Sequence, residues 1–385
     1  MKDQLHDALY RAGWAAVKRL PEPAANALGR KIADIAWRQR GKGVRRLESN
    51  LARVVPDATP EQLSALAHAG MRSYLRYWME SFRLPAWSKE RIRTGFDPKY
   101  LHYLEEGLAA GKGVILALPH MGNYDLAGAW VTTKLGVPFT TVAERLKPET
   151  LYDRFVAYRE SLGMEVLPHT GGAAFGTLAR RLRSGGLVCL VADRDLSASG
   201  IEVRFFGDTA RMPAGPAMLA LQTGALLLPV TLWYDDTSIL QGRVHPPIPL
   251  PQTGTRAEKA AMMTQAMADE FASGITEHPE HWHMLQRLWL ADFVSDAHEQ
   301  VERPASRDIS RWRGGRSRPR SARAGDSDMN LPLLSGDTSR RRQGKGGTSG
   351  RSEANEEAGV RPDAAVPEIP VPGVLRPDSP GTEKS

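Results

Sequence analysis

Short, wholly apolar segments alternate with amphipathic ones through the middle of the chain, and this alternation constrains the fold more than any other feature. Residues 113–118 form a continuous apolar run, as expected of a strand that is covered on both faces of a sheet. The same pattern predicts strands at 138–143, 164–167, 187–192 and 226–234, with helices at 124–134, 148–162, 173–183, 213–223 and 255–278. This order predicts an α/β fold with a central, mostly parallel sheet flanked by helices.

The segment before the first of these strands is predicted to be helical. Amphipathic helices are expected at 4–20 and 24–39, and a further helical stretch at 50–85 with a turn near 56–60. Leu and Trp side chains of the first 40 residues are flanked by Lys and Arg, which suits helices that lie on a membrane surface and equally suits helices packed on their own domain. We expect neither a signal peptide nor a membrane-spanning helix, so any membrane contact is predicted to be peripheral.

The composition changes near residue 300, which predicts a globular domain over residues 1–299 and a disordered tail over residues 300–385. The tail carries 16 Lys and Arg against 12 Asp and Glu, and Trp312 is its only aromatic residue, so it has too little apolar surface to fold. Its arginine runs suit anionic lipid or RNA, or a solvated tail without a fixed partner. The net charge of +7 is shared between both parts, which argues against nucleic-acid binding as the main function. The single cysteine, Cys189, excludes an internal disulfide.

His120 is the first candidate for chemistry, because it lies just beyond the predicted strand at 113–118. Catalytic side chains of α/β proteins gather at the carboxyl ends of parallel strands, and a histidine there can act as a general base. Asp125 follows five residues later and could hold the imidazole ring, while Asn123 is a candidate N-cap for the next helix. The spacing alone is weakly specific, and an ordinary loop histidine is the competing interpretation.

A second polar cluster, Asp193-Arg194-Asp195, follows the predicted strand at 187–192. Parallel strands end at one edge of the sheet, so Asp193 is expected near His120, and Arg194 could contact an anion. A surface ion-pair turn explains the same residues. Basic residues also gather after the predicted strand at 138–143 and in the predicted helix at 148–162, where they could bind phosphate groups. A solvated helix face is the simpler explanation. These residues are Arg145, Lys147, Arg154 and Arg159.

Two other classes of site are disfavoured. His278, His281 and His283 lack the cysteines or ordered acids that would complete a metal site, so we predict that they pack and that no metal is bound. A nucleotide-sugar enzyme would also combine strands and helices, but no convincing glycine-rich nucleotide loop is present.

Taken together, these motifs resemble the bacterial lipid A biosynthesis and lysophospholipid acyltransferase superfamily, and within it most closely the actinobacterial phosphatidylinositol mannoside acyltransferases. The resemblance covers about residues 5–293. It is carried jointly by several blocks: His120 to Asp125, Asp193-Arg194-Asp195, 200–203, Phe205-Phe206-Gly207, 210–217, 223–225, 228–230, Tyr77-Trp78-Met79-Glu80 and 282–286.

The resemblance implies a glycerolipid acyltransferase-like fold and a direct transfer of an acyl chain from acyl-CoA to a sugar hydroxyl. His120 would be the general base, oriented by Asp125 and assisted by Asp193, with neither a covalent acyl-enzyme nor a cofactor other than the acyl-CoA co-substrate. The resemblance further implies that substrates contact Glu144, Arg159, Arg194 and Asp195. It also implies Glu at the position of Asp193, so the shorter Asp makes the contact with His120 a point for the structure to decide.

The expected partners are acyl-CoA, a glycolipid acceptor and an anionic membrane surface, with no specific nucleic acid. The expected location is the cytoplasmic face of the cell membrane, and the expected acceptor is a mannose hydroxyl of phosphatidylinositol mannoside that receives a palmitoyl-type chain. A lysophospholipid or lipid A-type acceptor and a non-catalytic membrane-binding relative are the alternatives.

Overall fold

A computed structural model describes residues 17–143, 149–168, 173–195, 200–237 and 239–293 of the chain. Contacts divide the chain into two units, Met1–Gly336 and Asp337–Ser385, and every described residue belongs to the first. The predicted tail at 300–385 lies outside the described residues, as do residues 4–16 of the first predicted helix, whereas residues 17–19 are helical.

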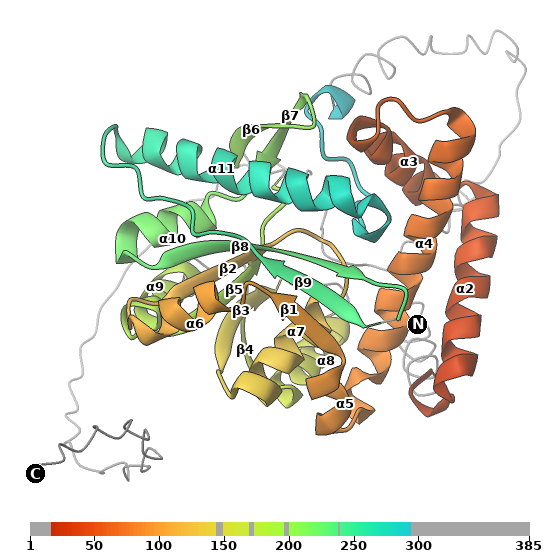
Figure 1. Cartoon of the computed structure of the whole chain (residues 1–385), viewed down its shortest axis with the longest axis horizontal. Helices are drawn as coiled ribbons and strands as arrows, with labels where there is room; N and C mark the ends of the chain where they lie inside the picture. Colours follow the sequence, from red (N-terminus) through yellow and green to blue (C-terminus); the bar gives the residue numbers. More distant parts are fainter. Residues whose placement is uncertain (1–16, 144–148, 169–172, 196–199, 238, 294–385) are drawn as a thin grey trace, which may run out of the picture. The chain divides into compact units, whose positions relative to one another are not determined.

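The core of the first unit is a seven-stranded sheet with the order β1-β9-β8-β2-β5-β3-β4 (Figure 1). All neighbouring strands are parallel except β8 and β9, which are antiparallel. The predicted α/β class and its mostly parallel sheet are therefore confirmed. The strands are β1 (Phe96–Lys99), β2 (Val114–Leu118), β3 (Phe139–Ala143), β4 (Met164–Pro168), β5 (Leu187–Val191), β8 (Leu226–Tyr234) and β9 (Leu240–Val244).

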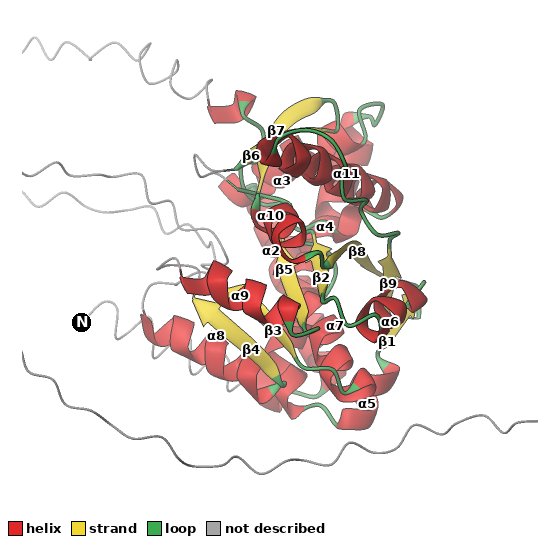
Figure 2. Cartoon of the chain, turned by 90° about the vertical axis from the view of Figure 1, so that its left-hand side faces the viewer, coloured by secondary structure: helices red, strands yellow, loops and turns green. Residues whose placement is uncertain are grey.

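Helices cover both faces of the sheet (Figure 2). Alternate residues of β2 pack on opposite faces, which explains why its sequence is apolar throughout. Ile115 and Ala117 pack into one hydrophobic cluster, whereas Val114, Leu116 and Leu118 pack into another on the opposite face. Helices α9 (Ala173–Arg183), α10 (Gly215–Thr223) and α11 (Arg256–Glu277) contribute to the first cluster. The second cluster is formed with α5 (Lys89–Thr94), α6 (His102–Ala109), α7 (Tyr124–Trp130) and α8 (Glu149–Ser161).

The chain passes through three longer helices before α5 and the first strand: α2 (Glu22–Gln39), α3 (Lys42–Val54) and α4 (Pro60–Arg83). Helix α4 begins with a capping box in which Thr59 and Gln62 exchange side-chain and backbone hydrogen bonds. Its two ends differ in their packing, because Met71 and Leu75 join one core cluster and Tyr77 and Trp78 join the other. Helix α4 thus contributes to both cores and brings its aromatic residues to the centre of the molecule.

Several elements lack the patterns on which the prediction relied. The edge strand β1 and its neighbour β9 contain charged, glycine and proline residues in place of an apolar run, and β6 (Ile201–Phe205) and β7 (Asp208–Met212) form a separate antiparallel hairpin with one polar face. The predicted helix at 124–134 is divided into α7 and a π-helical turn at Val131–Leu135. Within the described ranges, none of the helices has the length and apolarity needed to cross a bilayer.

Candidate active site

The backbone at His120 is fixed from two sides. Gly122 has φ +60°, and a Cβ at this position would lie 2.7 Å from the backbone oxygen of Leu232, so only glycine permits the loop after β2 to approach β8 this closely. On the other side, the backbone amide of His283 donates to the carbonyl of His120 at 2.7 Å, and that of Gly122 donates to the carbonyl of His281 at 2.9 Å. The loop that carries His120 is therefore held rigidly.

Asp193 is the carboxylate that contacts His120. The register pairs Leu118, the last residue of β2, with Val191, the last residue of β5. His120 and Asp193 therefore each lie two positions beyond the ends of neighbouring strands. The two side chains meet at 2.5 Å between His120 Nδ1 and Asp193 Oδ1, and the backbone amide of His120 donates to Asp193 Oδ2 at 2.9 Å. The predicted proximity of these two residues is confirmed, and the shorter Asp reaches His120 without the extra methylene of Glu.

The environment of Asp193 keeps it ionised. The side chain is fully buried, and burial raises the pKa of this carboxyl, but the charge of His120 and the hydrogen bonds from His120 and Trp282 outweigh it and hold the pKa below its ordinary value. An ionised carboxylate can only accept hydrogen bonds, so Nδ1 of His120 carries a proton, and in the neutral ring Nε2 is left with a lone pair. With its side chain 22% exposed, His120 can present that lone pair to a bound molecule.

Asp125 contacts Arg159 and Tyr77, and not His120 as predicted. Its Oδ1 accepts a hydrogen bond of 3.0 Å from Arg159 Nε, and its Oδ2 accepts one of 2.9 Å from the hydroxyl of Tyr77. Asp125 lies in the first turn of α7, beyond the Gly122 turn, and its side chain extends toward α4 and α8. The contact that the sequence assigned to Asp125, that of orienting the His120 ring, is made by Asp193 instead.

The buried Asp125 and Arg159 compensate each other's charge. Burial lowers the pKa of the Arg159 guanidinium, but the Asp125 carboxylate and the neighbouring Tyr77 reverse this effect and raise it above its ordinary value. Burial, and then the charge of Asp125, raise the pKa of Tyr77 well above its usual range, so the phenol remains a donor. Arg159 is therefore close to the histidine loop, but it is engaged by an acid of the protein.

The remaining predicted substrate contacts are less fully described. Arg194 directs Nη1 to the carbonyl of Arg287 at 3.3 Å, and the backbone amide of Asp195 donates to the carbonyl of Arg211 at 2.7 Å. Glu144, like Arg145 and Lys147, lies outside the described residues. The structure thus pairs His120 with Asp193 and Asp125 with Arg159, and links Arg194 to the 281–293 segment.

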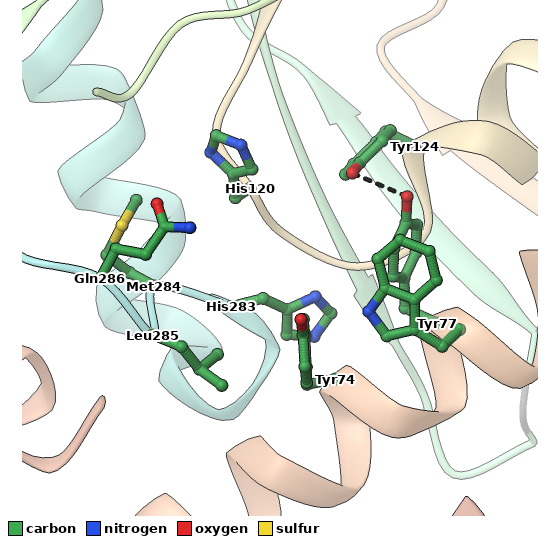
Figure 3. A pocket seen from close by; sticks show the side chains of 9 residues that line it. Tyr74, Tyr77, His120, Tyr124, His283, Met284, Leu285 and Gln286 are labelled. Carbon is green, nitrogen blue, oxygen red and sulfur yellow. Dashed lines mark hydrogen bonds between the residues drawn. The ribbon is translucent and has the colours of Figure 1, made fainter. Parts of the chain in front are cut away.

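A pocket opens beside His120 and is lined mainly by aromatic residues (Figure 3). The hydroxyls of Tyr77 and Tyr124 lie 2.7 Å apart on its wall. Nothing in the sequence indicated that the aromatic residues of α4 would lie beside the histidine. The pocket is lined by Tyr74, Tyr77, Trp78, His120, Tyr124, His283, Met284, Leu285 and Gln286.

Glu80 of α4 stabilises the loop that carries His120 by binding Asn123. Its Oε2 accepts a hydrogen bond of 2.9 Å from Asn123 Nδ2 and another from the hydroxyl of Tyr234, while its Oε1 accepts one of 2.7 Å from Arg76 Nε. Asn123 in turn caps α7 by accepting from the amide of Leu126, which confirms the predicted N-cap. A glutamate within a helix rich in aromatic residues could have indicated a buried acid at this position. The partners of Glu80 could not be predicted, because Asn123 and Tyr234 are distant in the sequence.

Of the three histidines in 278–283, His281 and His283 are buried and His278 is half-buried. His281 Nδ1 and His283 Nε2 lie 2.8 and 2.9 Å from the hydroxyl of Ser73, and His278 stacks on Trp233. Burial, with a smaller contribution from the charge of His278, lowers the pKa of His281 to about 3. Burial also holds the pKa of His283 well below its ordinary value, so this pocket residue is neutral. Among the described residues, no group of three His, Cys, Asp or Glu side chains could hold a metal ion.

The fold and the site define an α/β protein with a histidine–aspartate pair at the carboxyl edge of a parallel sheet, beside an aromatic pocket. Comparison with known proteins agrees with this class. The family model of bacterial lipid A biosynthesis acyltransferases matches residues 3–291. The chain therefore belongs to the bacterial lipid A biosynthesis acyltransferase family.

Individual relatives differ widely in their similarity. A phosphatidylinositol mannoside acyltransferase of Mycolicibacterium smegmatis is 47% identical over 295 residues, which cover 76% of this chain and 94% of the relative. One from Mycobacterium tuberculosis is 46% identical over 304 residues, covering 77% and 92%. A lipid A biosynthesis acyltransferase of Haemophilus influenzae is 22% identical over 278 residues, covering 72% and 82%.

Proposed function

We propose that this protein transfers a palmitoyl-type chain from acyl-CoA to a mannose hydroxyl of a phosphatidylinositol mannoside. Two mycobacterial relatives with that acceptor in their names are 46% and 47% identical to this chain over nearly their whole length, which supports the acceptor. The single observation that carries the chemistry is the contact of 2.5 Å between His120 Nδ1 and the buried Asp193.

In this proposal, His120 is the general base of a direct transfer. Nε2 takes the proton from the mannose hydroxyl while the hydroxyl oxygen attacks the thioester carbonyl carbon, and Asp193 stabilises the imidazolium that results. A carbon–oxygen bond forms and the carbon–sulfur bond breaks. The proton then passes from Nε2 to the departing sulfur of CoA. Because the oxygen attacks the thioester itself, no covalent acyl-enzyme is required.

The predicted substrate contacts remain part of the proposal. Arg194 and Asp195 follow Asp193 directly and are proposed to contact the phosphate-bearing substrate, with Glu144 as a further candidate. Arg159 is proposed to affect the substrate indirectly, through the residues that it contacts, because its Nε already donates to Asp125 Oδ1 at 3.0 Å. Asp125 is then a positioning residue for Arg159.

We also propose peripheral attachment to an anionic membrane, at the cytoplasmic face, through α2. Leu28 and Ile35 are 38% and 42% exposed and lie seven residues apart, which puts them on one face of the helix. The exposed charged residues near them, Arg30, Lys31 and Arg38, are all basic. Apolar side chains with basic neighbours suit insertion at the level of anionic head groups.

The decisive experiment measures transfer of labelled palmitate from palmitoyl-CoA to purified phosphatidylinositol mannosides by wild type and by His120→Ala. We expect transfer by wild type and a loss of at least a hundredfold in the variant, with the melting temperature unchanged. Transfer to a lysophospholipid or a lipid A precursor, but not to mannosides, would overturn the acceptor. If the wild type acylates none of these lipids, acyl transfer itself is contradicted.

A further inference from the structure

Trp282 contacts the proposed catalytic pair directly. Its indole Nε1 donates a hydrogen bond of 3.0 Å to Oδ2 of Asp193, the oxygen that also accepts from the backbone amide of His120. Oδ1 is bound to His120 Nδ1 at 2.5 Å. Both carboxylate oxygens are thus engaged, and Asp193 is oriented by three donors of which Trp282 supplies the only one outside His120 itself among the described contacts.

The indole is itself held in place. Trp282 is fully buried, and its backbone forms a β-bridge with Met121, in the loop that carries His120. Its ring packs against Phe205 and Phe206 of the β6–β7 hairpin, with centroid separations of 5.9 and 6.1 Å. The 281–293 segment, through Trp282, therefore contacts both the His120 loop and the β6–β7 hairpin, into which the chain continues after Asp193.

The hydrogen bond has a clear physical consequence. A carboxylate at zero exposure has no water to replace a missing donor, so loss of the indole N–H leaves Oδ2 with one partner in a dry site. The remaining contacts all come from His120, the residue that Asp193 has to orient. Without the indole donor, the carboxylate is held only by the backbone amide and the ring of His120, and the direction of Nε2 is less firmly fixed.

We propose that Trp282 is a positioning residue for the proposed acyl transfer, which fixes Asp193 so that His120 Nε2 is directed at the acceptor hydroxyl. The inference rests on the proposed function of His120 and Asp193. It extends that function to a side chain that lies outside the pocket and whose role in transfer no spacing or motif indicated.

Trp282→Phe tests the proposal, because it keeps an aromatic ring and removes the N–H. We expect kcat to fall about tenfold, the effect of losing one hydrogen bond to a charged group, with the KM values of both substrates unchanged within about twofold. Trp289→Phe is the matched control. Trp289 is equally buried in the same segment, but its Nε1 donates at 2.9 Å to the neutral amide oxygen of Asn50. The control should lower stability and leave kcat within about twofold.

A double-mutant comparison separates positioning from general loosening of the fold. If Trp282 acts through Asp193, then adding Trp282→Phe to Asp193→Asn should lower the residual kcat by less than about twofold, because the two changes disable one unit. A further tenfold loss in the double variant, or an equal loss of kcat in Trp289→Phe, would overturn the proposal.

An NMR measurement on the full chain distinguishes failure of this inference from failure of the proposed function. With 15N-labelled histidine, the Nδ1–H of His120, assigned by its absence in His120→Ala, should give a downfield proton signal in wild type. We expect Trp282→Phe to broaden or remove that signal and Trp289→Phe to preserve it, whatever lipid the enzyme acylates. An unchanged signal in Trp282→Phe contradicts the positioning role even if transfer is observed, and a lost signal supports it even if the acceptor proves to be different.

Discussion

Arg159 Nε lies 3.0 Å from Asp125 Oδ1, and both side chains are buried, so the acid five residues after His120 neutralises a cation instead of orienting the imidazole. Breaking a buried ion pair by removing one partner leaves an uncompensated charge. We expect Asp125→Asn to lower the free energy of unfolding by about 3 kcal/mol, measured by denaturant unfolding.

A matched control for this prediction is Glu165→Gln, because Glu165 pairs with Arg181 at the surface, where water replaces the lost contact. Its effect should be much smaller. The double variant Asp125→Asn/Arg159→Met should recover part of the stability lost in Asp125→Asn, because it removes the stranded cation. Equal stability losses in Asp125→Asn and Glu165→Gln would contradict the assignment.

The contact between His120 and Asp193 could be predicted from the sequence because each residue follows a recognisable strand. The apolar runs at β2 and β5 predicted two parallel strands, and the positions of His120 and Asp193 just beyond them were enough to predict that the two residues meet. The strand register brings the two side chains to the same level, since Leu118 pairs with Val191. Asp125 was assigned incorrectly because five residues of sequence spacing do not reveal the turn at Gly122, which separates the two side chains.

Contacts between distant segments could not be predicted in the same way. Trp282 and Glu80 lie far from His120 in the sequence, and their polar contacts depend on how the 281–293 segment and α4 pack against the sheet. The strands β1, at one edge of the sheet, and β9, beside it, were missed for a related reason. Both strands are short and contain polar residues such as Asp97 and Arg243, so neither shows the continuous apolar run on which the strand prediction relied.

The buried His281 predicts acid sensitivity of the fold. Its pKa is about 3 in the folded protein and about 6.5 when unfolded, so between these values the unfolded state binds one more proton. Stability should therefore fall as the pH drops from about 6.5 toward 3, with His281 contributing a slope of about 1.4 kcal/mol per pH unit. His281→Asn keeps a polar atom near Ser73 and should reduce this slope by about one proton, measured by denaturant unfolding between pH 4 and 7. His102→Asn, at an exposed position, should leave it unchanged; a slope insensitive to His281→Asn would disprove the linkage.

The exposed face of α2 predicts membrane binding that a surface substitution can abolish. Leu28→Glu/Ile35→Glu should reduce partitioning onto vesicles of anionic lipid at least tenfold, because it removes inserted apolar groups and adds negative charge. Higher salt should weaken wild-type binding as well, since the basic residues contribute through screened charges. Met262→Glu on α11 is the matched control: Met262 is 48% exposed, and the variant should bind like wild type. Vesicle co-sedimentation measures both, and equal losses in both variants would argue against α2 as the docking helix.

Gly122 predicts how strongly the proposed activity depends on the loop after β2. In Gly122→Ala the new methyl group would lie 2.7 Å from the carbonyl oxygen of Leu232, and backbone atoms of a central strand cannot yield, so the loop carrying His120 has to move. We expect a stability loss of several kcal/mol and a loss of acyl transfer of at least a hundredfold.

Gly136→Ala separates strain from displacement, because Gly136 has a similar φ of +68° but no atom within 4 Å of its added methyl group. Its cost should be limited to about 1 kcal/mol of backbone strain, with transfer retained. If both variants lost activity equally, left-handed strain alone would explain the effect; loss confined to Gly122→Ala would mean that the close approach of this loop to β8 sets the position of His120.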